Sequence, residues 1–255
     1  LTLDDPIGDH LSELAWTGDE VTIRSLLQHT SGIPDYDENS DLLDRLMELA
    51  DEPTNQDVLA VLSEETELIY DTGEQFLYSN TGYDVLGALI ESASGQYYAE
   101  FMKENIFAPL GMNNTFALPN ANRLTDPNIS MSYVFEDGEP TAYPSDPIDN
   151  INGSGSIYSN LDDMALYDQA LYTDKIVSQS TLAEAFQTGI LNNGEETEYG
   201  FAWDIGNYQG EDYIAHSGAW LGFYTYYLRF PAQELSVLVL FNSDYSDPDP
   251  ETLAY

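Results

Sequence analysis

The first half of the chain has the hydrophobic spacing of a series of helices. Apolar side chains recur there every three or four positions, the spacing that places them on one face of a helix. Glycine and proline interrupt the pattern, since neither residue continues a helix easily. The clearest helix follows Ser79-Asn80 and stops at Gly95. The pattern predicts helices over residues 21–27, 42–49, 58–62, 83–93 and 97–107.

The chain then changes character before the helical spacing returns. Over residues 119–155, Pro, Asn, Asp, Ser and Gly separate short extended pieces, which predicts a long irregular connection. A loop of this length is uncommon in a compact domain unless it forms or covers a site. Helices are predicted again at 161–171, after the N-cap pair Ser159-Asn160, and near 180–186.

From residue 199 onward the side-chain pattern is that of β-strands. The gaps between the strands are short and hold turn residues, so neighbouring strands should be antiparallel. The last strand is almost wholly apolar, which predicts that it is covered on both faces. The predicted strands cover residues 199–205, 212–216, 223–230 and 235–241.

The charge of the chain excludes some classes of partner. Six Lys and Arg residues stand against 46 Asp and Glu, for a formal net charge of −40. Such a field repels phosphates and anionic headgroups, so we expect neither a nucleic-acid partner nor a membrane-surface partner. The acidic residues are spread along the whole chain, which indicates a surface adapted to high salt, as in a halophile, where a screening length of about 3 Å suppresses the repulsion. The alternative is the surface of an ordinary acidic protein.

Several kinds of site lack their motifs in these 255 residues. There is no cysteine, which excludes disulfides, thiolate zinc sites and a cysteine nucleophile. The three histidines, His10, His29 and His216, do not have metal-ligand spacing, and no nucleotide-binding motif and no Gly-x-Ser-x-Gly elbow occurs. We therefore expect no metal and no cofactor. No apolar run approaches about 18 residues, so no membrane segment is expected in this chain.

Two short constellations could carry chemistry. Tyr78-Ser79-Asn80 opens the clearest helix, where a phenol can carry protons and an amide two residues on can turn toward the same cleft. Residues 216–219, His-Ser-Gly-Ala, follow a predicted strand, and glycine there lets the backbone approach a ligand whose oxyanion the next N–H could bind. Taken alone, each has a structural alternative: helix capping for the first, and a β-bulge or hairpin for the second.

Six stretches in a fixed order connect these constellations to a known family. They are residues 3–6, 22–34, 78–83, 110–112, 155–163 and 216–222, and they run across nearly the whole chain. On these stretches the sequence resembles the serine β-lactamase and penicillin-binding-protein superfamily. The resemblance is to the branch that holds class C β-lactamases, D-alanyl-D-alanine carboxypeptidases, D-aminopeptidases and related esterases.

The resemblance implies roles for both constellations. In that family Ser-x-x-Lys, Tyr-x-Asn and Lys-Thr-Gly or its His-x-Gly variant meet in one cleft, where the serine forms an acyl-enzyme. By position, Tyr78 would be the acid and base partner, and His216 would take the cation position of the third motif. The substrate-binding and oxyanion residues would be Asn80, Ser217, Gly218 and Ala219.

The first of the family's three motifs is missing. The only lysines are Lys103 and Lys175, and Glu100 and Tyr172 stand three residues before them, so no Ser-x-x-Lys exists in this sequence. In relatives that motif opens a helix that ends just before a segment like the one at Leu1. We therefore expect that an N-terminal segment, which would carry the nucleophile and complete the sheet and the site, precedes this chain.

The fold implied by the resemblance is α+β, of the β-lactamase/transpeptidase type. It combines an all-helical region with an antiparallel sheet flanked by helices. We expect a mainly helical region over 1–155, including the connection at 119–155, and helices with the C-terminal antiparallel strands over 156–255. The sheet would be incomplete, with about three of its five strands.

The leading functional hypothesis is a serine hydrolase that forms an acyl-enzyme on a D-amino-acid peptide, a β-lactam or a small ester. His216 weakens the case for β-lactams, because a permanent cation recognises their carboxylate better. Trp220, Phe223 and Tyr224 indicate an apolar or peptide-like acyl group, and nothing supports class A β-lactamases. The alternatives are a non-catalytic binding or regulatory protein without the nucleophile, and one piece of a split enzyme. The resemblance favours an extracellular or cell-surface location.

Overall fold

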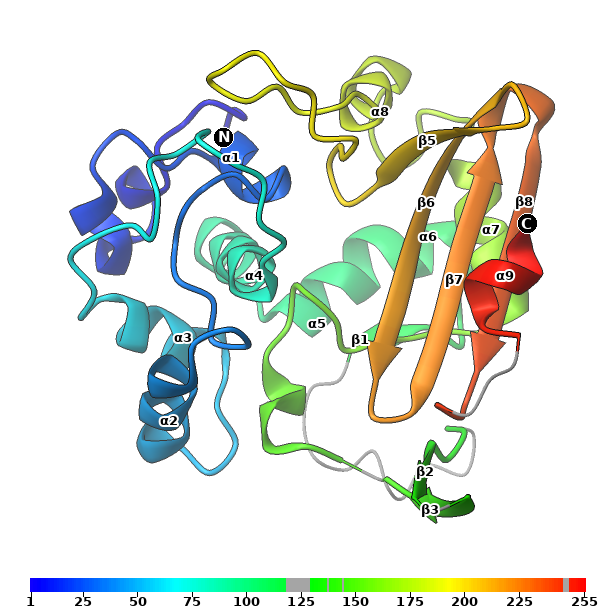
Figure 1. Ribbon diagram of the computed structural model, residues 1–255, viewed down its shortest axis with the longest axis horizontal. Helices are drawn as coiled ribbons and strands as arrows, with labels where there is room; N and C mark the ends of the chain where they lie inside the picture. The colour runs from blue at the N-terminus through cyan, green and yellow to red at the C-terminus, as the bar shows by residue number, and fades with distance from the viewer. Residues whose placement is uncertain (118–128, 137, 144, 245–247) are drawn as a thin grey trace. The chain divides into compact units, whose positions relative to one another are not determined.

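The computed structural model describes residues 1–117, 129–136, 138–143, 145–244 and 248–255, and they divide into two compact units (Figure 1). Neither unit is continuous in sequence. Residues 156–179 were predicted to belong to the region of the C-terminal strands, but they lie with the helices of the first unit. The first unit consists of Leu1–Asn120, Pro147–Gln179 and Gly189–Thr197, and the second of Ala121–Asp146, Ser180–Thr188 and Glu198–Tyr255.

The first unit is mainly helical, and every helix predicted for this part of the chain is confirmed. One predicted helix, at 97–107, continues through a π-helical stretch and ends only at Gly111, where φ is 80°. Two short strands, β1 (Phe116–Ala117) and β4 (Ile157–Tyr158), pair antiparallel. The helical elements are η1 Ile7–Asp9, η2 Ser12–Thr17, α1 Ile23–Leu27, α2 Ser40–Leu49, α3 Asn55–Leu62, α4 Asn80–Ser94, α5 Tyr98–Met102, η3 Lys103–Phe107, α6 Ala108–Leu110, η5 Pro147–Asn150 and α7 Leu161–Ala170.

Local capping explains why α4 occupies the residues that it does. The Ser79 hydroxyl accepts a hydrogen bond from the Gly82 N–H at 3.0 Å, so a side chain satisfies one of the unpaired N–H groups of the first turn. At the other end Gly95 adopts a left-handed conformation with φ 70°, which few other residues tolerate. The cap therefore fixes the position of Tyr78, which lies directly before it.

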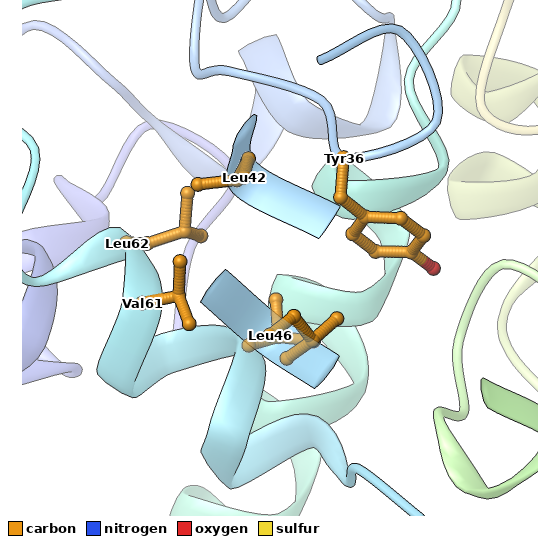
Figure 2. A pocket seen from close by; sticks show the side chains of 6 residues that line it. Tyr36, Leu42, Leu46, Val61 and Leu62 are labelled. Carbon is orange, nitrogen blue, oxygen red and sulfur yellow. The ribbon is translucent and has the colours of Figure 1, made fainter. Parts of the chain in front are cut away.

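The core of the first unit contains the pocket shown in Figure 2. Its lining side chains come from α2, α3 and the preceding loop, and all of them are at most 4% exposed. The Tyr36 hydroxyl points away from the aliphatic side chains (Figure 2), so the space is apolar and belongs to the hydrophobic core. The lining residues are Tyr36, Leu42, Leu46, Val58, Val61 and Leu62.

The second unit is built on a four-stranded antiparallel sheet in the order β5-β6-β7-β8 (Figure 1). A short C-terminal helix, α9 (Pro250–Ala254), lies against β7 and β8 (Figure 1). Ala215, Tyr226 and Leu228 are buried on one face of this sheet. The strands are β5 Asp204–Tyr208, β6 Glu211–Trp220, β7 Phe223–Phe230 and β8 Leu235–Phe241, with η6 Pro231–Gln233 between the last two.

The remaining elements of the second unit are short. The hairpin of β2 (Tyr133–Glu136) and β3 (Glu139–Ala142) lies within the predicted connection at 119–155, and so does η5 of the first unit. Residues 119–128, 137 and 144 of that connection lie outside the described residues. Almost all of α8 (Gln179–Ala185) also belongs to this unit and confirms the helix predicted near 180–186.

The sheet corrects four expectations. It has four strands rather than about three. The strand predicted at 199–205 is wrong, because the chain turns between Tyr199 and Asp204, which form an isolated bridge, and β5 starts only at Asp204. The strand predicted at 212–216 runs on to Trp220. β8 is not covered on both faces: it lies at an edge of the sheet and none of its side chains is buried.

None of the helices in the described residues is long and apolar enough to cross a membrane.

Candidate active site

The predicted site residues fall into two groups, one in each unit. Tyr78 and Asn80 belong to the first unit, whereas residues 216–219 belong to the second. Within each group the structure shows which neighbours hold the side chains. That the two groups share one cleft stays a prediction.

His29 holds the backbone and the ring of the tyrosine motif. Its Nδ1 accepts a hydrogen bond from the Ser79 N–H at 3.0 Å, and its carbonyl oxygen accepts one from the Leu77 N–H at 2.9 Å. The imidazole ring lies 4.2 Å from the Tyr78 ring, centroid to centroid, and is itself only 2% exposed. Because Nδ1 accepts, the hydrogen bonds assign the ring proton to Nε2. Tyr78, which is 43% exposed, therefore stands on a rigid buried support.

Two carboxylates hold the start of α4 beside this support. The Asn80 Nδ2 donates to Asp37 Oδ2 at 2.6 Å, and the Thr81 N–H donates to Asp35 Oδ2 at 3.2 Å. Asp35 Oδ1 also accepts from the Asp37 N–H at 2.8 Å, so the two aspartates are connected. The N-terminus of a helix carries partial positive charge, which favours carboxylates at this place. The segment between α1 and α2 thus fixes both ends of the Tyr78-Ser79-Asn80 motif.

Sequence reasoning missed His29, Asp35 and Asp37 as parts of this site. The stretch 22–34, which contains His29, contributed to the family resemblance, but its glycine and proline were interpreted only as a stop signal for a helix, and Asp35 and Asp37 lie just beyond it. The available signal was the combination of one histidine and two aspartates in a short turn before a helix. Nothing in the spacing, however, shows that this turn meets residues about 45 positions further on.

A buried carboxylate lies on α4 behind the motif. Asp84 is fully buried, and its two oxygens accept hydrogen bonds from the Tyr36 hydroxyl at 2.7 Å and the Ser154 N–H at 3.0 Å. Burial disfavours the charged form and raises the pKa of Asp84 to about 6, although both hydrogen bonds favour the ionised carboxylate. Asn55 adds a second connection, since its side-chain amide bonds the backbone N–H and C=O of Asn152. Residues 152–154 are therefore fastened to α3 and α4.

Asp84→Asn is expected to stabilise the protein in a pH-dependent manner. The raised pKa means that the unfolded state loses its proton near pH 4 and the folded state near pH 6, so ionisation of Asp84 costs stability as pH rises between these values. The full difference is about 3 kcal/mol. Asparagine keeps an oxygen for the Ser154 N–H, and the Tyr36 hydroxyl can accept from its NH2 group.

Urea unfolding of wild type and Asp84→Asn from pH 4 to pH 7, at one fixed KCl concentration, measures this effect. The difference in unfolding free energy should move in favour of the variant as pH rises. A difference that is constant with pH would contradict the buried titration of Asp84. The many other carboxylates titrate in both proteins and cancel in the comparison.

In the second unit, both ring nitrogens of His216 are engaged by protein groups. Nδ1 lies 2.6 Å from the Ser217 carbonyl oxygen, which can only accept, so Nδ1 carries a proton. Nε2 lies 2.9 Å from the hydroxyl of Tyr199, which is buried. A hydroxyl can donate to a neutral Nε2 or accept from a protonated one, so these bonds hold the ring in either charge state. Burial raises the pKa of the neighbouring Asp204, and the charge of His216 opposes that rise.

The backbone after His216 forms an open strand edge. Glu211 pairs with Tyr208 at the two-residue turn that joins β5 to β6, and in such a turn this pair is hydrogen-bonded. Every second residue from Glu211 onward, that is, each odd-numbered residue of β6, therefore directs its N–H and C=O groups toward β5. β5 begins at Asp204, opposite Ala215, and the chain before it turns away. Within the described part of the chain, Ser217 and Ala219 therefore lie beyond the end of β5, with their N–H groups directed at an edge that no strand covers.

Gly218 makes a close packing contact with β7, and its role in ligand binding stays a prediction. It pairs with Thr225 on β7, and a Cβ at Gly218 would lie 2.5 Å from the Thr225 Oγ1. The pairing of β6 with β7 keeps one register from Ile214 to Trp220, so the β-bulge is absent there. The other structural alternative, a hairpin, is present, because β6 and β7 are joined by a turn at residues 221–222. Residues 216–219 consequently lie inside a strand and do not follow one.

The described residues contain no group of three or more His, Cys, Asp or Glu side chains arranged to hold a metal ion.

The architecture and the order of the motifs define a class of proteins. A helical unit and an antiparallel sheet unit, which bear the Tyr-x-Asn and His-x-Gly motifs respectively, are the parts of the β-lactamase/transpeptidase-like fold. The chain belongs to the beta-lactamase family, whose sequence model, described as Beta-lactamase, matches residues 1–255.

Individual relatives agree with this assignment. The chain is 35% identical to penicillin-binding protein 4* of Bacillus subtilis over 239 residues, which covers 88% of this chain and 52% of the relative. The octameric penicillin-binding protein homologue from Pyrococcus abyssi superposes with a TM-score of 0.82 at 29% identity, over 100% of this chain and 58% of that one. A D-stereospecific amidohydrolase from Streptomyces sp. shares the fold, with a TM-score of 0.79 at 22% identity over 100% of this chain and 79% of that one. The chain spans about half the length of the curated relatives it matches.

Proposed function

We propose that the complete protein is a serine hydrolase that forms an acyl-enzyme on an amide or ester. The observation that supports this most is the Tyr78-Ser79-Asn80 motif, held at the start of α4 by His29 and two carboxylates in a member of the beta-lactamase family. An exposed phenol on a rigid support suits a group that moves protons to and from a reacting atom.

The proposed reaction needs a nucleophile from outside residues 1–255. No Ser-x-x-Lys occurs in this sequence, and its relatives are longer. We propose that an additional segment of the complete protein contributes the serine and lysine, and that it extends the sheet along the edge of β8 that no strand of the described residues covers. The exposed apolar side chains Leu235 and Leu240 on that strand support this, because such an edge is normally covered.

Several of the predicted residues have a definite task in this reaction, and Asn80 would hold the substrate amide. The serine oxygen attacks the acyl carbonyl carbon while Tyr78, as a phenolate stabilised by the contributed lysine cation, accepts the serine proton. The bond from the carbonyl carbon to the departing nitrogen or oxygen then breaks, and Tyr78 passes the proton to the departing atom. The Ala219 N–H, directed at the open edge of β6, would donate to the oxyanion, with Ser217 lining the same edge. Water then hydrolyses the ester bond to the serine and restores the enzyme.

The proposed substrate is a D-amino-acid peptide or related acyl compound, with β-lactams and small esters as the other members of the class. The relatives named D-aminopeptidase and D-stereospecific amidohydrolase support this choice. Trp220 and Phe223, which pair across β6 and β7 on the same face of the sheet as His216, favour an apolar or peptide-like acyl group, whereas Tyr224 lies on the opposite face. His216, held by neutral partners, would supply a positive charge only when protonated, which favours substrates without an obligatory carboxylate.

Covalent labelling of the full-length protein tests the proposal. A fluorescent penicillin or a p-nitrophenyl ester should leave an acyl group on a serine that mass spectrometry can locate. Protection from heat by the same compounds without any adduct would instead support a binding protein that lacks the nucleophile. Labelling that arises only after two separate chains are mixed would support a split enzyme.

We also propose that the protein is adapted to high salt. The supporting observation is the 46 acidic residues, of which only Asp35, Asp84, Asp149 and Asp163 are buried among the residues that the structure describes. Raising KCl from 0.1 M to 3 M should increase the thermal midpoint by about 10 °C or more, because screening removes repulsion in the folded state. Sucrose, which is excluded from protein surfaces but does not screen charge, is the control. A midpoint indifferent to KCl would refute the proposal.

A further inference from the structure

The hydrogen bond between Asn80 and Asp37 carries an inference about how the site is oriented. The Asn80 Nδ2 donates to Asp37 Oδ2 at 2.6 Å, a short distance typical of a bond to a charged acceptor. Both residues belong to the first unit, and Asp37 is exposed. The bond lies outside the buried core and therefore adds little to the stability of the fold. We infer that its main effect is to orient the Asn80 side-chain amide.

An ionised carboxylate decides which way the amide faces. The two ends of an asparagine amide have nearly the same shape, but a carboxylate can only accept, so the NH2 group has to lie on its side. Asp37 is itself fixed, because its N–H donates to Asp35 Oδ1 and the other oxygen of Asp35 accepts from the Thr81 N–H. These hydrogen bonds lead from the Thr81 N–H through Asp35 and Asp37 to the Asn80 side chain. Because Asn80 and Thr81 are adjacent in the sequence, the contacts form a closed ring.

We propose that Asp37 is a positioning residue, which locks the Asn80 amide with its nitrogen toward Asp37 and its oxygen on the opposite side. The inference rests on the proposed function, in which Asn80 holds the substrate. The oxygen then accepts from an N–H or an ammonium group, and the second N–H of the amide, which this bond does not use, can donate to a carbonyl. A substrate with a secondary amide next to its reacting carbonyl matches this pair of groups, whereas a simple ester offers no N–H.

A double-mutant cycle in the full-length protein tests the inference. Acylation by benzylpenicillin, which carries a side-chain amide, and by p-nitrophenyl acetate, which does not, is measured for wild type, Asp37→Ala, Asn80→Ala and the double variant. Asp37→Ala should slow acylation by benzylpenicillin roughly 10- to 100-fold, as expected for a misoriented contact, and acylation by the ester by less than about threefold. In the Asn80→Ala background the change at residue 37 should have no further effect, within about twofold.

Two more variants separate orientation from charge. Asp37→Asn keeps the shape but lets residue 37 donate as well as accept, so it should slow benzylpenicillin about as much as Asp37→Ala does. Glu38→Gln removes the neighbouring exposed carboxylate and is the matched control, with acylation expected to stay at the wild-type rate. Equal effects of Asp37→Ala in the presence and absence of Asn80, or equal effects on both substrates, would overturn the proposal.

A spectroscopic measurement keeps the inference testable if no substrate reacts. Absence of any adduct in wild type would count against the proposed function alone. In the wild-type protein, one of the two Asn80 side-chain amide protons should be shifted downfield and exchange slowly with water, and Asp37→Ala should abolish both properties while the Gly82 amide signal stays in place. Unchanged Asn80 side-chain signals in Asp37→Ala would overturn the positioning role whatever the activity.

Discussion

Tyr78→Phe should lower the acylation rate of the full-length protein by about 100- to 10,000-fold, the range over which positioned acid and base groups act. The change removes only the hydroxyl, so the ring contact with His29 at 4.2 Å and the cap of α4 are kept. The thermal midpoint should therefore remain within about 2 °C of the wild-type value. Stopped-flow acylation by a fluorescent penicillin gives the rate, and circular dichroism gives the midpoint.

A tyrosine elsewhere supplies the control for this experiment. Tyr97 is 74% exposed and lies at the start of α5, so Tyr97→Phe makes the same chemical change away from the motif. It should acylate at the wild-type rate. Normal turnover in Tyr78→Phe would remove Tyr78 from the proposed role and shift attention to the contributed lysine as the base.

Gly87→Ala should destabilise the protein by about 3 kcal/mol, although alanine is the better helix former. A Cβ at this position of α4 would lie 2.1 Å from the Asn152 carbonyl oxygen and 2.6 Å from the Asn55 Nδ2, so the segment 152–154 has to move away. Overpacking of this kind costs about 1–3 kcal/mol, and the displaced Asn55 hydrogen bonds add about 1 kcal/mol each.

Gly82→Ala, in the same helix, is the matched control. A Cβ there meets nothing closer than the Ser79 Oγ at 3.6 Å, which is ordinary contact. We expect it to leave stability unchanged or to raise it by up to about 1 kcal/mol through helix propensity. Urea unfolding at fixed KCl compares the two variants. If Gly87→Ala were as stable as Gly82→Ala, the close approach of Asn152 to α4 would be contradicted.

The helices could be predicted because their signals are local. Ser79 and Gly95 bracket α4 in the sequence as they do in the structure, and the capping hydrogen bonds join residues only three or four positions apart. The same holds for the boundary at Gly111. Where start and stop signals lie within a few residues of the element, sequence alone fixes it.

The errors in the sheet come from contacts that the local pattern does not contain. The segment before β5 alternates like a strand, but Glu198 and Ala202 adopt positive φ values of 55° and 61° and make it turn. Such values are uncommon for these residue types, so their sequence gives no warning. β8 has the composition of a central strand, yet it lies at an edge in the sheet as described. The composition of a single strand does not show whether it lies at an edge or in the middle of a sheet.

The site residues divide in the same way. The family resemblance brought out Tyr78, Asn80 and His216, because their motifs are short and contiguous. The residues that hold them, His29, Asp37 and Tyr199, lie 17 to 50 positions away and act through single hydrogen bonds or ring contacts. No spacing rule connects such partners, since only the folded chain brings them together.

The fastening of residues 152–154 to α3 and α4 also determines when the motif becomes rigid during folding. The hydrogen bonds of Asn55 and Asp84 to this segment close loops of 97 and 70 positions, whereas α4 itself forms from neighbours. A contact between distant positions has to close a long loop, and the entropy cost of that closure comes before the contact stabilises the fold. Such contacts therefore form late. The helix that carries Tyr78 and Asn80 should thus exist early, and its buried face should be sealed only when the segment arrives. Until then the Asp84 carboxylate remains hydrated and ionised at neutral pH, and its dehydration belongs to one of the last steps of folding.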